Sequence, residues 1–318
     1  MKLTTVLTVT IVVGLIILSS TSQASKPIKI GSGTEGKNYH GMINDVIDYC
    51  AAETGRPLEN RPSPGGSTQN ILDMSNKLLH AGLTQIDVLK FQARIMGEKV
   101  NQNRMKVIIG AHRESGHLVI PPNWQPSSES MWGNILSTMG MGDEKKGISI
   151  DLIKNQSVGG WGGSLVSIRA LSSFMKLGLQ AVEIKPGQQV KHPIMIVGGQ
   201  PDKHVQAYLN AGWKLVPINA ESLKARASFY DAVSLNYSIK GKLTSVPSFG
   251  VRAVLIGKSS RSAKRNKPFS NLATCLRRNL ADLADDSDTN PNWESVYEFE
   301  NDGQVNWQYF PLNEDTEL

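Results

Sequence analysis

The chain has 318 residues, of which 40% are hydrophobic and 19% charged, and its formal net charge is +6. This length accommodates two modest domains with cores of their own, and the composition is ordinary for a globular protein. The charge is too mild to indicate nucleic-acid binding, and the sequence has neither zinc-finger spacing nor an RNA-binding aromatic signature.

The N-terminus has the features of a secretory signal peptide, residues 1–24. Lys2 precedes an apolar run over residues 6–18, and Ser22-Gln23-Ala24 supplies the small side chains that signal peptidase requires. We expect cleavage after Ala24 and a periplasmic mature protein. An uncleaved membrane anchor is the alternative, although the run is short for a bilayer span.

A glycine-rich loop, Gly31–Tyr39, follows this segment. The alternation of Ile28 and Ile30 predicts a strand before it, and the apolar spacing over residues 42–50 predicts a helix after it. Unpaired N–H groups at a helix start suit a carboxylate or phosphate, and glycines let the backbone approach a ligand closely. The alternative is that the glycines only shape a tight turn.

Three later segments repeat this loop-to-helix pattern, at residues 62–70, 158–164 and 198–202. Ser67 or Thr68 is the expected N-cap of the second helix, since its hydroxyl can accept from an orphan N–H. Proline is tolerated in the first turn of a helix, so Pro201 is expected in the first turn of the helix that follows the fourth loop.

Strands are expected between these helices. Their predicted positions are 58–61, 82–88, 107–111, 117–120, 148–153, 182–184, 193–197, 213–218 and 249–256. Residues 121–147 are polar and hard to interpret, with a short helix expected at 131–139. The alternation of strands and helices predicts an α/β fold with largely parallel sheets, in which ligands bind at the carboxyl ends of strands.

The chain has two cysteines, Cys50 on the first predicted helix and Cys275 in a helical run near the C-terminus. An oxidising compartment permits a disulfide between them, and two buried free thiols are the alternative.

Residues 258–267 form a basic loop, and the chain is acidic from residue 282 onward. Solvated surface is the usual explanation for each, and a docking surface for another protein is the alternative.

Catalytic and metal-binding patterns are absent from the sequence. His112 and His117 do not have a standard zinc spacing, Gly163-Ser164 is not part of a Gly-x-Ser-x-Gly nucleophile elbow, and there is no Walker loop. We therefore expect a protein that is not an enzyme and that needs no cofactor or metal. An exported hydrolase is kept as an alternative.

Several segments in order resemble the TAXI-type substrate-binding subunits of TRAP transporters, a branch of the periplasmic binding proteins. The matching segments are Gly31–Tyr39, Gly66–Asn70, Gln85-Ile86-Asp87, Val197–Pro201, Leu215–Ile218 and Phe249–Leu255. The sequence departs from the family at His80, where the family has Asp, and at Gly162–Leu165, where the family's ligand-loop hydroxyls are moved or lost. The segment 125–146 is also longer than in the family.

The resemblance implies an α/β, two-lobed periplasmic-binding-protein-like fold with a ligand cleft between the lobes. Lobe 1 would hold residues 25–112 and, with the C-terminal tail, 248–318. Lobe 2 would hold residues 113–247. Such lobes close on a ligand by hinge motion. Family members bind small organic acids, some of them amino acids, and pass them to membrane transporter subunits.

The candidate ligand-binding residues follow from the glycine loops, the ends of the predicted strands and the resemblance. They are Gly33, Thr34, Lys37, Asn38, Tyr39, Gly66, Ser67, Asn70, Gln85, Asp87, Trp161, Gly163, Ser164, Gly199 and Gln200. Structural roles compete with ligand contact at several of them. Ser67 and Asn70 can instead serve helix capping, Asp87 can cap a following helix, and Trp161 can be a wedge buried against its own lobe.

The expected ligand is a small molecule with a carboxylate, and the expected partner is a membrane transporter. The first alternative is a ligand sensor or adaptor of the same fold that docks to a membrane receptor, for which the basic loop and the altered loop at residues 162–165 are the indications. No nucleic-acid partner is expected.

Overall fold

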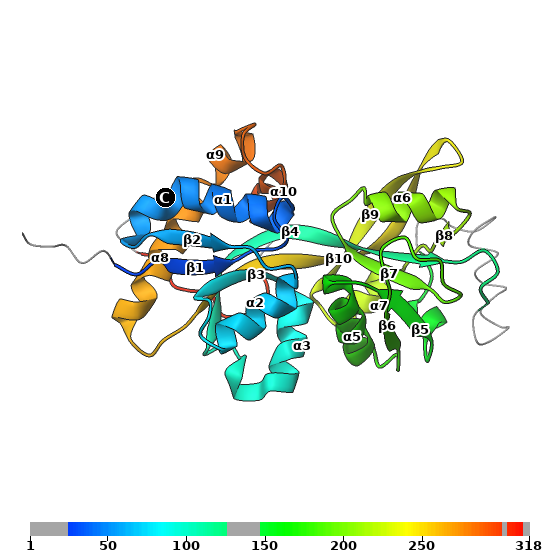
Figure 1. Cartoon of the computed structure of the whole chain (residues 1–318), viewed down its shortest axis with the longest axis horizontal. Helices are drawn as coiled ribbons and strands as arrows, with labels where there is room; N and C mark the ends of the chain where they lie inside the picture. The colour runs from blue at the N-terminus through cyan, green and yellow to red at the C-terminus, as the bar shows by residue number, and fades with distance from the viewer. Residues whose placement is uncertain (1–24, 126–146, 301–303, 314–318) are drawn as a thin grey trace, which may run out of the picture.

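The computed structural model describes residues 25–125, 147–300 and 304–313. Figure 1 shows two lobes that lie side by side and are connected by long strands. The expected signal peptide and the helix expected at 131–139 lie outside the described residues. Among the described residues, no helix is both long enough and apolar enough to cross a bilayer.

Within the described ranges, ten strands form one sheet in the order β2-β1-β3-β10-β4-β7-β5-β6, with β8 beside β4 and β9 beside β10. Their bounds are β1 (Ile28–Gly31), β2 (Leu58–Arg61), β3 (Ala81–Gln85), β4 (Met105–Ile120), β5 (Ser157–Gly160), β6 (Gln180–Glu183), β7 (Ile194–Gly198), β8 (Lys214–Leu215), β9 (Tyr230–Ile239) and β10 (Lys242–Lys258). The pairs β1–β2, β1–β3, β5–β6 and β5–β7 are parallel. The pairs that involve β4 or β10 are antiparallel, so the sheet is mixed and not largely parallel as predicted.

The strands β4 and β10 cross from one lobe to the other (Figure 1). They pair antiparallel from Met105 opposite Lys258 to Ser115 opposite Gly250. The two strands expected at 107–111 and 117–120 are therefore one continuous strand. The predicted lobe boundaries, 112/113 and 247/248, fall within these two strands and stay a prediction.

Helices cover both faces of the sheet. Their bounds are α1 (Asn38–Cys50), α2 (Gly66–Ser75), α3 (Ile86–Met96), α5 (Gly163–Met175), α6 (Lys203–Asn210), α7 (Ala220–Lys224), α8 (Ala263–Arg278), α9 (Leu280–Asp285) and α10 (Asn292–Glu300). In Figure 1, α1 lies above the strands of the first lobe, and α2 and α3 lie below them. The α/β class and the two-lobed arrangement that the sequence predicts are confirmed.

The strand expected at residues 82–88 ends at Gln85, and α3 begins at Ile86. The alternation of residues 82–88 resembles a strand, but Ile86, Leu89, Ala93 and Met96 recur at helical spacing and pack on the core. As a result Asp87 lies in the first turn of a helix and not at the end of a strand.

Four other expectations are corrected in detail. Residues 148–153 form a single bridge at Ile148 and then a 3-10 helix, Ile150–Ile153. The strand expected at 213–218 is limited to β8. Asp202 caps α6 through Oδ1, so Pro201 precedes the cap instead of lying in the first turn. The N-cap of α2 is Gly65, because the helix begins at Gly66 and Ser67 and Thr68 both lie within its first turn.

One apolar core continues across the boundary between the lobes. It includes Ile71 and Leu89 from the first lobe and Ile168 and Leu171 from the second, all buried in one cluster. At its edge, the Arg94 guanidinium carbon of α3 lies 4.0 Å from the centre of the Phe174 ring of α5. The lobes are therefore packed together along their α3–α5 side.

The two cysteines form a disulfide that joins α1 to α8. Both side chains are fully buried in the core of the first lobe. The bridge ties together positions 225 residues apart, so the return of the C-terminal part to the first lobe is fixed covalently.

We predict that the double variant Cys50→Ala/Cys275→Ala loses about 2–5 kcal/mol of unfolding free energy, because the unfolded chain regains the freedom of a long closed loop. Urea unfolding of the oxidised wild type, the reduced wild type and the variant measures this. The reduced wild type serves as the control, since it should approach the variant. Equal stability of all three proteins would contradict the prediction.

Candidate functional site

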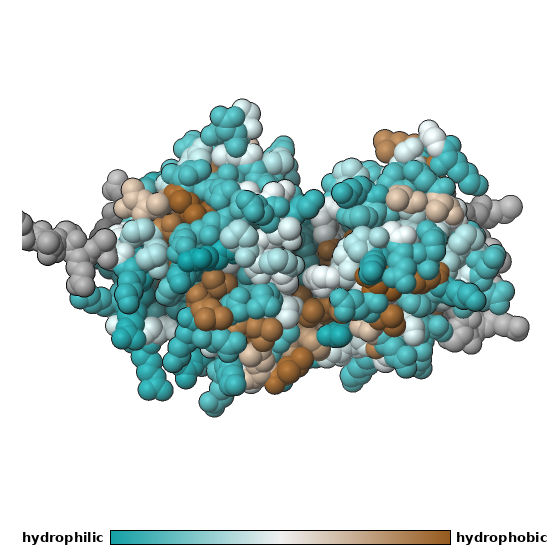
Figure 2. All heavy atoms as spheres, in the orientation of Figure 1, coloured by the Kyte–Doolittle hydropathy of each residue, from teal (hydrophilic) through white to brown (hydrophobic). Residues whose placement is uncertain are grey.

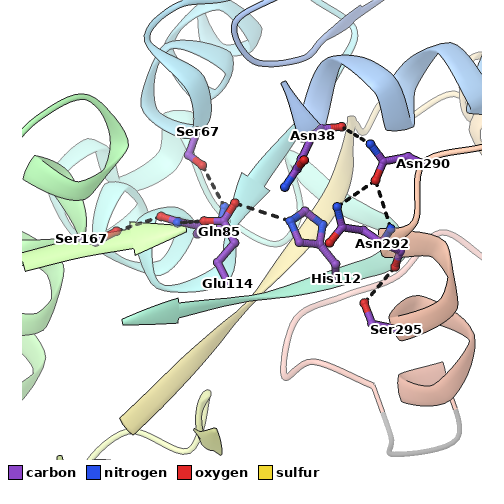
Figure 3. Close-up of polar contacts among 9 residues, drawn as sticks. All are labelled: Asn38, Ser67, Gln85, His112, Glu114, Ser167, Asn290, Asn292 and Ser295. Atoms are coloured by element: carbon purple, nitrogen blue, oxygen red, sulfur yellow. Dashed lines mark hydrogen bonds and ion pairs between the residues drawn. The ribbon is translucent and has the colours of Figure 1, made fainter. Parts of the chain in front are cut away.

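The boundary between the lobes holds a buried polar cluster around Gln85, at the end of β3. Gln85 Nε2 donates to Glu114 of β4, and Gln85 Oε1 accepts from the Ser167 hydroxyl of α5 at 2.8 Å. Its backbone N–H donates to Ser67 Oγ at 3.1 Å (Figure 3). This one side chain therefore connects α5 of the second lobe to a strand that belongs to both lobes.

The same cluster continues through Glu114 to His112 and Tyr39. The His112 Nε2 atom lies 3.7 Å from Glu114 Oε1, and the His112 ring packs edge-on against Tyr39 with centroids 5.7 Å apart. Burial first, and the Glu114 charge second, raise the pKa of Tyr39 well above its ordinary value. A neutral Tyr39 hydroxyl is therefore held beside a carboxylate.

A second polar contact crosses the boundary at Asp87. Its Oδ1 accepts from the Val88 N–H at 2.7 Å, and its Oδ2 accepts from the Tyr230 hydroxyl of β9 at 3.3 Å. Burial raises the pKa of Asp87 to about 7, against the lowering effect of these two hydrogen bonds. The nearby Glu114 charge adds to the rise.

Beside this cluster, a groove of about 510 Å³ lies between the lobes. Figure 2 shows the two halves of the molecule separated by a hollow along the upper part of their boundary. The groove is lined by Asn38, Arg113, Ser115, Gly199, Gln200, Ala232, Val233, Ser234, Pro291, Asn292, Ser295 and Phe299. Among these residues Arg113 has the one charged side chain.

The walls of the groove come close together at one point. A Cβ atom added to Gly199 would lie 3.2 Å from Asn38 Nδ2, so these residues of the two lobes nearly touch. On the first lobe, Asn290 Nδ2 donates to the Asn38 carbonyl at 3.4 Å, and Asn292 Nδ2 donates to Asn290 Oδ1 at 2.8 Å (Figure 3). This wall is therefore a connected array of amides.

The predicted site residues separate into three groups. Asn38, Gly199 and Gln200 line the groove. Tyr39, Ser67, Gln85 and Asp87 belong to the buried contacts described above. The others lie outside the lining of the groove: Gly33, Thr34, Lys37, Gly66, Asn70, Trp161, Gly163 and Ser164. Whether any of them contacts a ligand stays a prediction.

Three of the residues outside the groove have clear internal partners. Asn70 is fully buried, and its Nδ2 donates to the carbonyls of Gly31, Ser32 and Leu83. Ser164 Oγ accepts from the Val197 N–H at 3.0 Å. Trp161 packs edge-on against His204 of its own lobe, with centroids 5.4 Å apart.

Sequence analysis did not single out Arg113, Ser115 or the residues of α10. A signal existed for the first two, because residues 112–115 are a polar run inside an apolar stretch that continues on both sides. Asn292 and Ser295 carried no local signal. They reach the groove because Asp45 of α1 accepts from the Asn290 N–H and the Trp293 ring N–H, at 2.9 and 2.7 Å.

The described residues contain no group of three or more His, Cys, Asp or Glu side chains that could hold a metal ion. The groove and the cluster thus offer hydrogen-bond donors, acceptors and one guanidinium. An arrangement of this kind can bind a small polar molecule.

No protein-family model and no curated protein matches the sequence. Distant likenesses are found among solved structures. One is the SsuA protein of Methylobacillus flagellatus KT, described as a putative periplasmic sulfonate-binding protein of an ABC transporter. It is 12% identical, with 92% of this chain and 74% of that chain covered and a TM-score of 0.45.

Two further structures are similar at the same level. The substrate-binding protein of an amino acid ABC transporter is 8% identical, and the alignment covers 86% of this chain and 98% of that protein, with a TM-score of 0.42. A histidine kinase sensor domain is 8% identical, with 89% and 98% covered and a TM-score of 0.44. These likenesses concern the fold alone. The TAXI-type resemblance stays a prediction.

We predict that Asn70→Asp destabilises the protein by about 3–5 kcal/mol, because it places an uncompensated carboxylate against three carbonyl oxygens. Urea unfolding measures the loss. Asn76→Asp, an exposed position at the end of the same helix, is the control and should be near neutral. A fully stable Asn70→Asp protein would show that this amide has no structural role.

We predict that Asp87 makes the protein less stable as the pH rises from about 4 to about 7. Its pKa in the folded state is raised to about 7, so in this range the folded protein keeps a proton that the unfolded chain releases. The loss is on the order of 4 kcal/mol. Asp87→Asn should remove this slope in urea unfolding across the range, whereas Asp48→Asn, at an exposed position, should keep it. An unchanged slope in Asp87→Asn would refute the assignment.

Proposed function

We propose that this protein is an extracytoplasmic solute-binding protein. It captures a small organic acid or amino-acid-like ligand in the groove between the lobes and delivers it to a TRAP-type membrane transporter. The observation that carries the proposal is the lining of the groove, which comes from both lobes and combines one guanidinium with neutral amides and hydroxyls. This combination suits an anion that is small and polar.

Arg113 is the proposed anchor for the ligand's carboxylate. Its guanidinium carbon lies 4.0 Å from the centre of the Phe299 ring, so the ring covers one flat face and leaves the N–H edge for an acceptor. Arg113 Nη2 is 3.4 Å from Asp231 Oδ2, a long contact that leaves its other donors for the ligand. Bidentate, charge-assisted pairing with a carboxylate is a strong contact for a guanidinium and also fixes the ligand's orientation.

The neutral side chains then give specificity. Asn38 and Asn292 belong to the first lobe, and Gln200 and Ser234 belong to the second, so a ligand that bonds to both walls favours the closed arrangement. In this proposal the lobes comprise residues 25–112 with 248–318, and residues 113–247. They move about β4 and β10, the strands that cross between them.

One observation favours a second candidate function. The apolar core that continues across the lobe boundary resists opening, because separating α3 from α5 exposes apolar surface to water. Lobes that stay together suit a ligand sensor or adaptor that docks to a membrane receptor. A cognate transporter that moves a ligand only in the presence of this protein would decide for the first function.

We predict that one class among carboxylic acids, amino acids and sugars raises the melting temperature of the mature protein. A ligand at a hundredfold excess over Kd adds about 2.7 kcal/mol of stability. We expect an acid to cause this rise in melting temperature, and we expect the rise to be much smaller in the variants Arg113→Gln and Gln200→Ala. Lys203→Ala, at an exposed position just beyond the groove, should keep it.

Two outcomes would count against the proposal. If no acid at millimolar concentration changes the melting temperature, the protein does not bind an acid of the proposed class. A shift that survives in both Arg113→Gln and Gln200→Ala would place the binding outside the groove.

A further inference from the structure

An open pocket of about 370 Å³ lies on the α3–α5 side of the lobe boundary. We call it the aromatic pocket. In Figure 1, α3 and α5 lie below the strands, whereas α1 and α10, which supply residues of the groove, lie above them. The aromatic pocket is lined by Lys90, Arg94, Phe174, Arg226, Ala227, Ser228, Phe229, Asn306 and Trp307. None of these residues lines the groove, so the two hollows can be separated by mutation.

Three aromatic side chains line this pocket. The Phe174 and Phe229 rings pack edge to face, with centroids 4.9 Å apart, and both side chains are partly buried. Trp307 is buried, and its ring N–H donates to the Met105 carbonyl at 2.7 Å, which fixes its orientation. Fixed rings that stay partly open to solvent suit the packing of another flat ring.

Two cations of α3 lie against these rings. Lys90 and Arg94 are one helical turn apart and therefore share a face of the helix, where like charges repel each other. Lys90 Nζ lies 5.5 Å from the Phe229 centroid and 5.6 Å from the Trp307 ring. The Arg94 guanidinium carbon lies 4.0 Å from the Phe174 centroid. Rings in these positions stabilise the cations without using their N–H donors.

Both cations keep donors for a ligand. Lys90 Nζ donates to the Asn306 carbonyl at 2.7 Å, which uses one N–H of its ammonium group. Arg94 Nη1 has one long contact, 3.5 Å from Ser173 Oγ, and its side chain is exposed. Among the described residues, neither cation forms an ion pair with a carboxylate. Their remaining N–H groups can therefore meet an anion.

The lining of the aromatic pocket, as far as the chain is described, contains no Asp or Glu. Its third cation, Arg226, is paired with Asp151, which lies outside the lining, at 3.2 Å. Burial first, and the Arg94 charge second, lower the pKa of Lys90. An anion that binds to Lys90 and Arg94 together would relieve the repulsion between them.

We propose that the aromatic pocket is a second binding site, for a molecule that carries an anionic group on a flat aromatic ring system. Lys90 and Arg94 bind the anionic group, and the ring system packs against Phe174 and Phe229. The cations belong to the first lobe and the two phenylalanines to the second, so a bound molecule holds the lobes together. This site goes beyond the proposed function and does not require the groove to be occupied.

The test is calorimetric titration of the full mature protein with 1-naphthoate and, separately, with adenosine monophosphate. Acetate and inorganic phosphate are the matched controls, because they carry the same anionic groups without an aromatic ring. We expect at least one aromatic anion to bind, about tenfold or more tightly than its control, and more weakly as the salt concentration rises.

Each outcome of the titrations has a definite meaning. Binding of 1-naphthoate alone would assign the site to aromatic carboxylates, binding of adenosine monophosphate alone would assign it to aromatic phosphates, and binding of both would assign it to the two classes together. If neither binds, or if every aromatic anion that binds does so no more tightly than its control, the proposal is wrong.

Variants with matched controls locate the site. Arg94→Gln should weaken binding about tenfold, because a charge-assisted contact is lost at an exposed position. Lys99→Gln removes the same charge from an exposed position outside the pocket and should bind as the wild type does. Phe174→Leu keeps an apolar side chain without the ring and should weaken binding severalfold. Its control is Tyr297→Leu, which removes an exposed ring outside the pocket.

Two further results would overturn the proposal. Gln200→Ala alters the groove alone and should leave the binding of both aromatic anions unchanged. Loss of binding in Gln200→Ala together with full binding in Arg94→Gln would place the aromatic anion in the groove. An equal loss in Lys99→Gln and Arg94→Gln would show an effect of overall charge and not of a site.

Discussion

The antiparallel pairing of β4 with β10 is the interaction on which the rest of the molecule depends. Each strand belongs to both lobes, so the lobes share one sheet and cannot be described separately. The packing there is close: a Cβ atom on Gly116 would lie 2.2 Å from the Phe249 ring, and Ser248 Oγ donates to the Gly116 carbonyl at 2.5 Å. Side chains at the middle of these strands are thereby fixed relative to both lobes.

Successive residues of a strand point to opposite faces, and this simple rule explains why two chemically different regions lie so close together. His112 and Glu114 enter the buried cluster with Tyr39 and Gln85, whereas Arg113 and Ser115 line the groove. The Glu114 carboxylate and the Arg113 guanidinium therefore lie on opposite faces of the sheet. On the Glu114 side the carboxylate is hydrogen-bonded by Gln85, whereas the buried Tyr39 hydroxyl and both His112 ring nitrogens have no hydrogen-bond partner among the described residues. On the opposite face Arg113 and Ser115 line the groove.

The sequence was sufficient for the α/β class and the loop-to-helix transitions, because hydrophobic period and glycine position are local signals. The two lobes were expected from the resemblance to a known family. The sequence was insufficient for roles that depend on distant partners. Asn70 follows a ligand-like loop in sequence, yet it donates to the carbonyls of Leu83 in β3, of Gly31 at the end of β1 and of Ser32 directly after it. Asn292 carries no local pattern and reaches the groove only because α10 docks on α1. Arg113 was detectable in principle, but the polar run around it was interpreted as a break between two strands.

The relation between the lobes limits how a ligand can act. The contacts Gln85–Ser167 and Asp87–Tyr230, together with the core shared by α3 and α5, hold the lobes together without any ligand. A ligand shifts such an equilibrium only by the difference between its affinities for the two states. The groove lies beside these contacts and opens to solvent, so a ligand can enter without breaking them. Selectivity would then reside in the lining, above all in the single guanidinium and the amides that face it, more than in the closing motion.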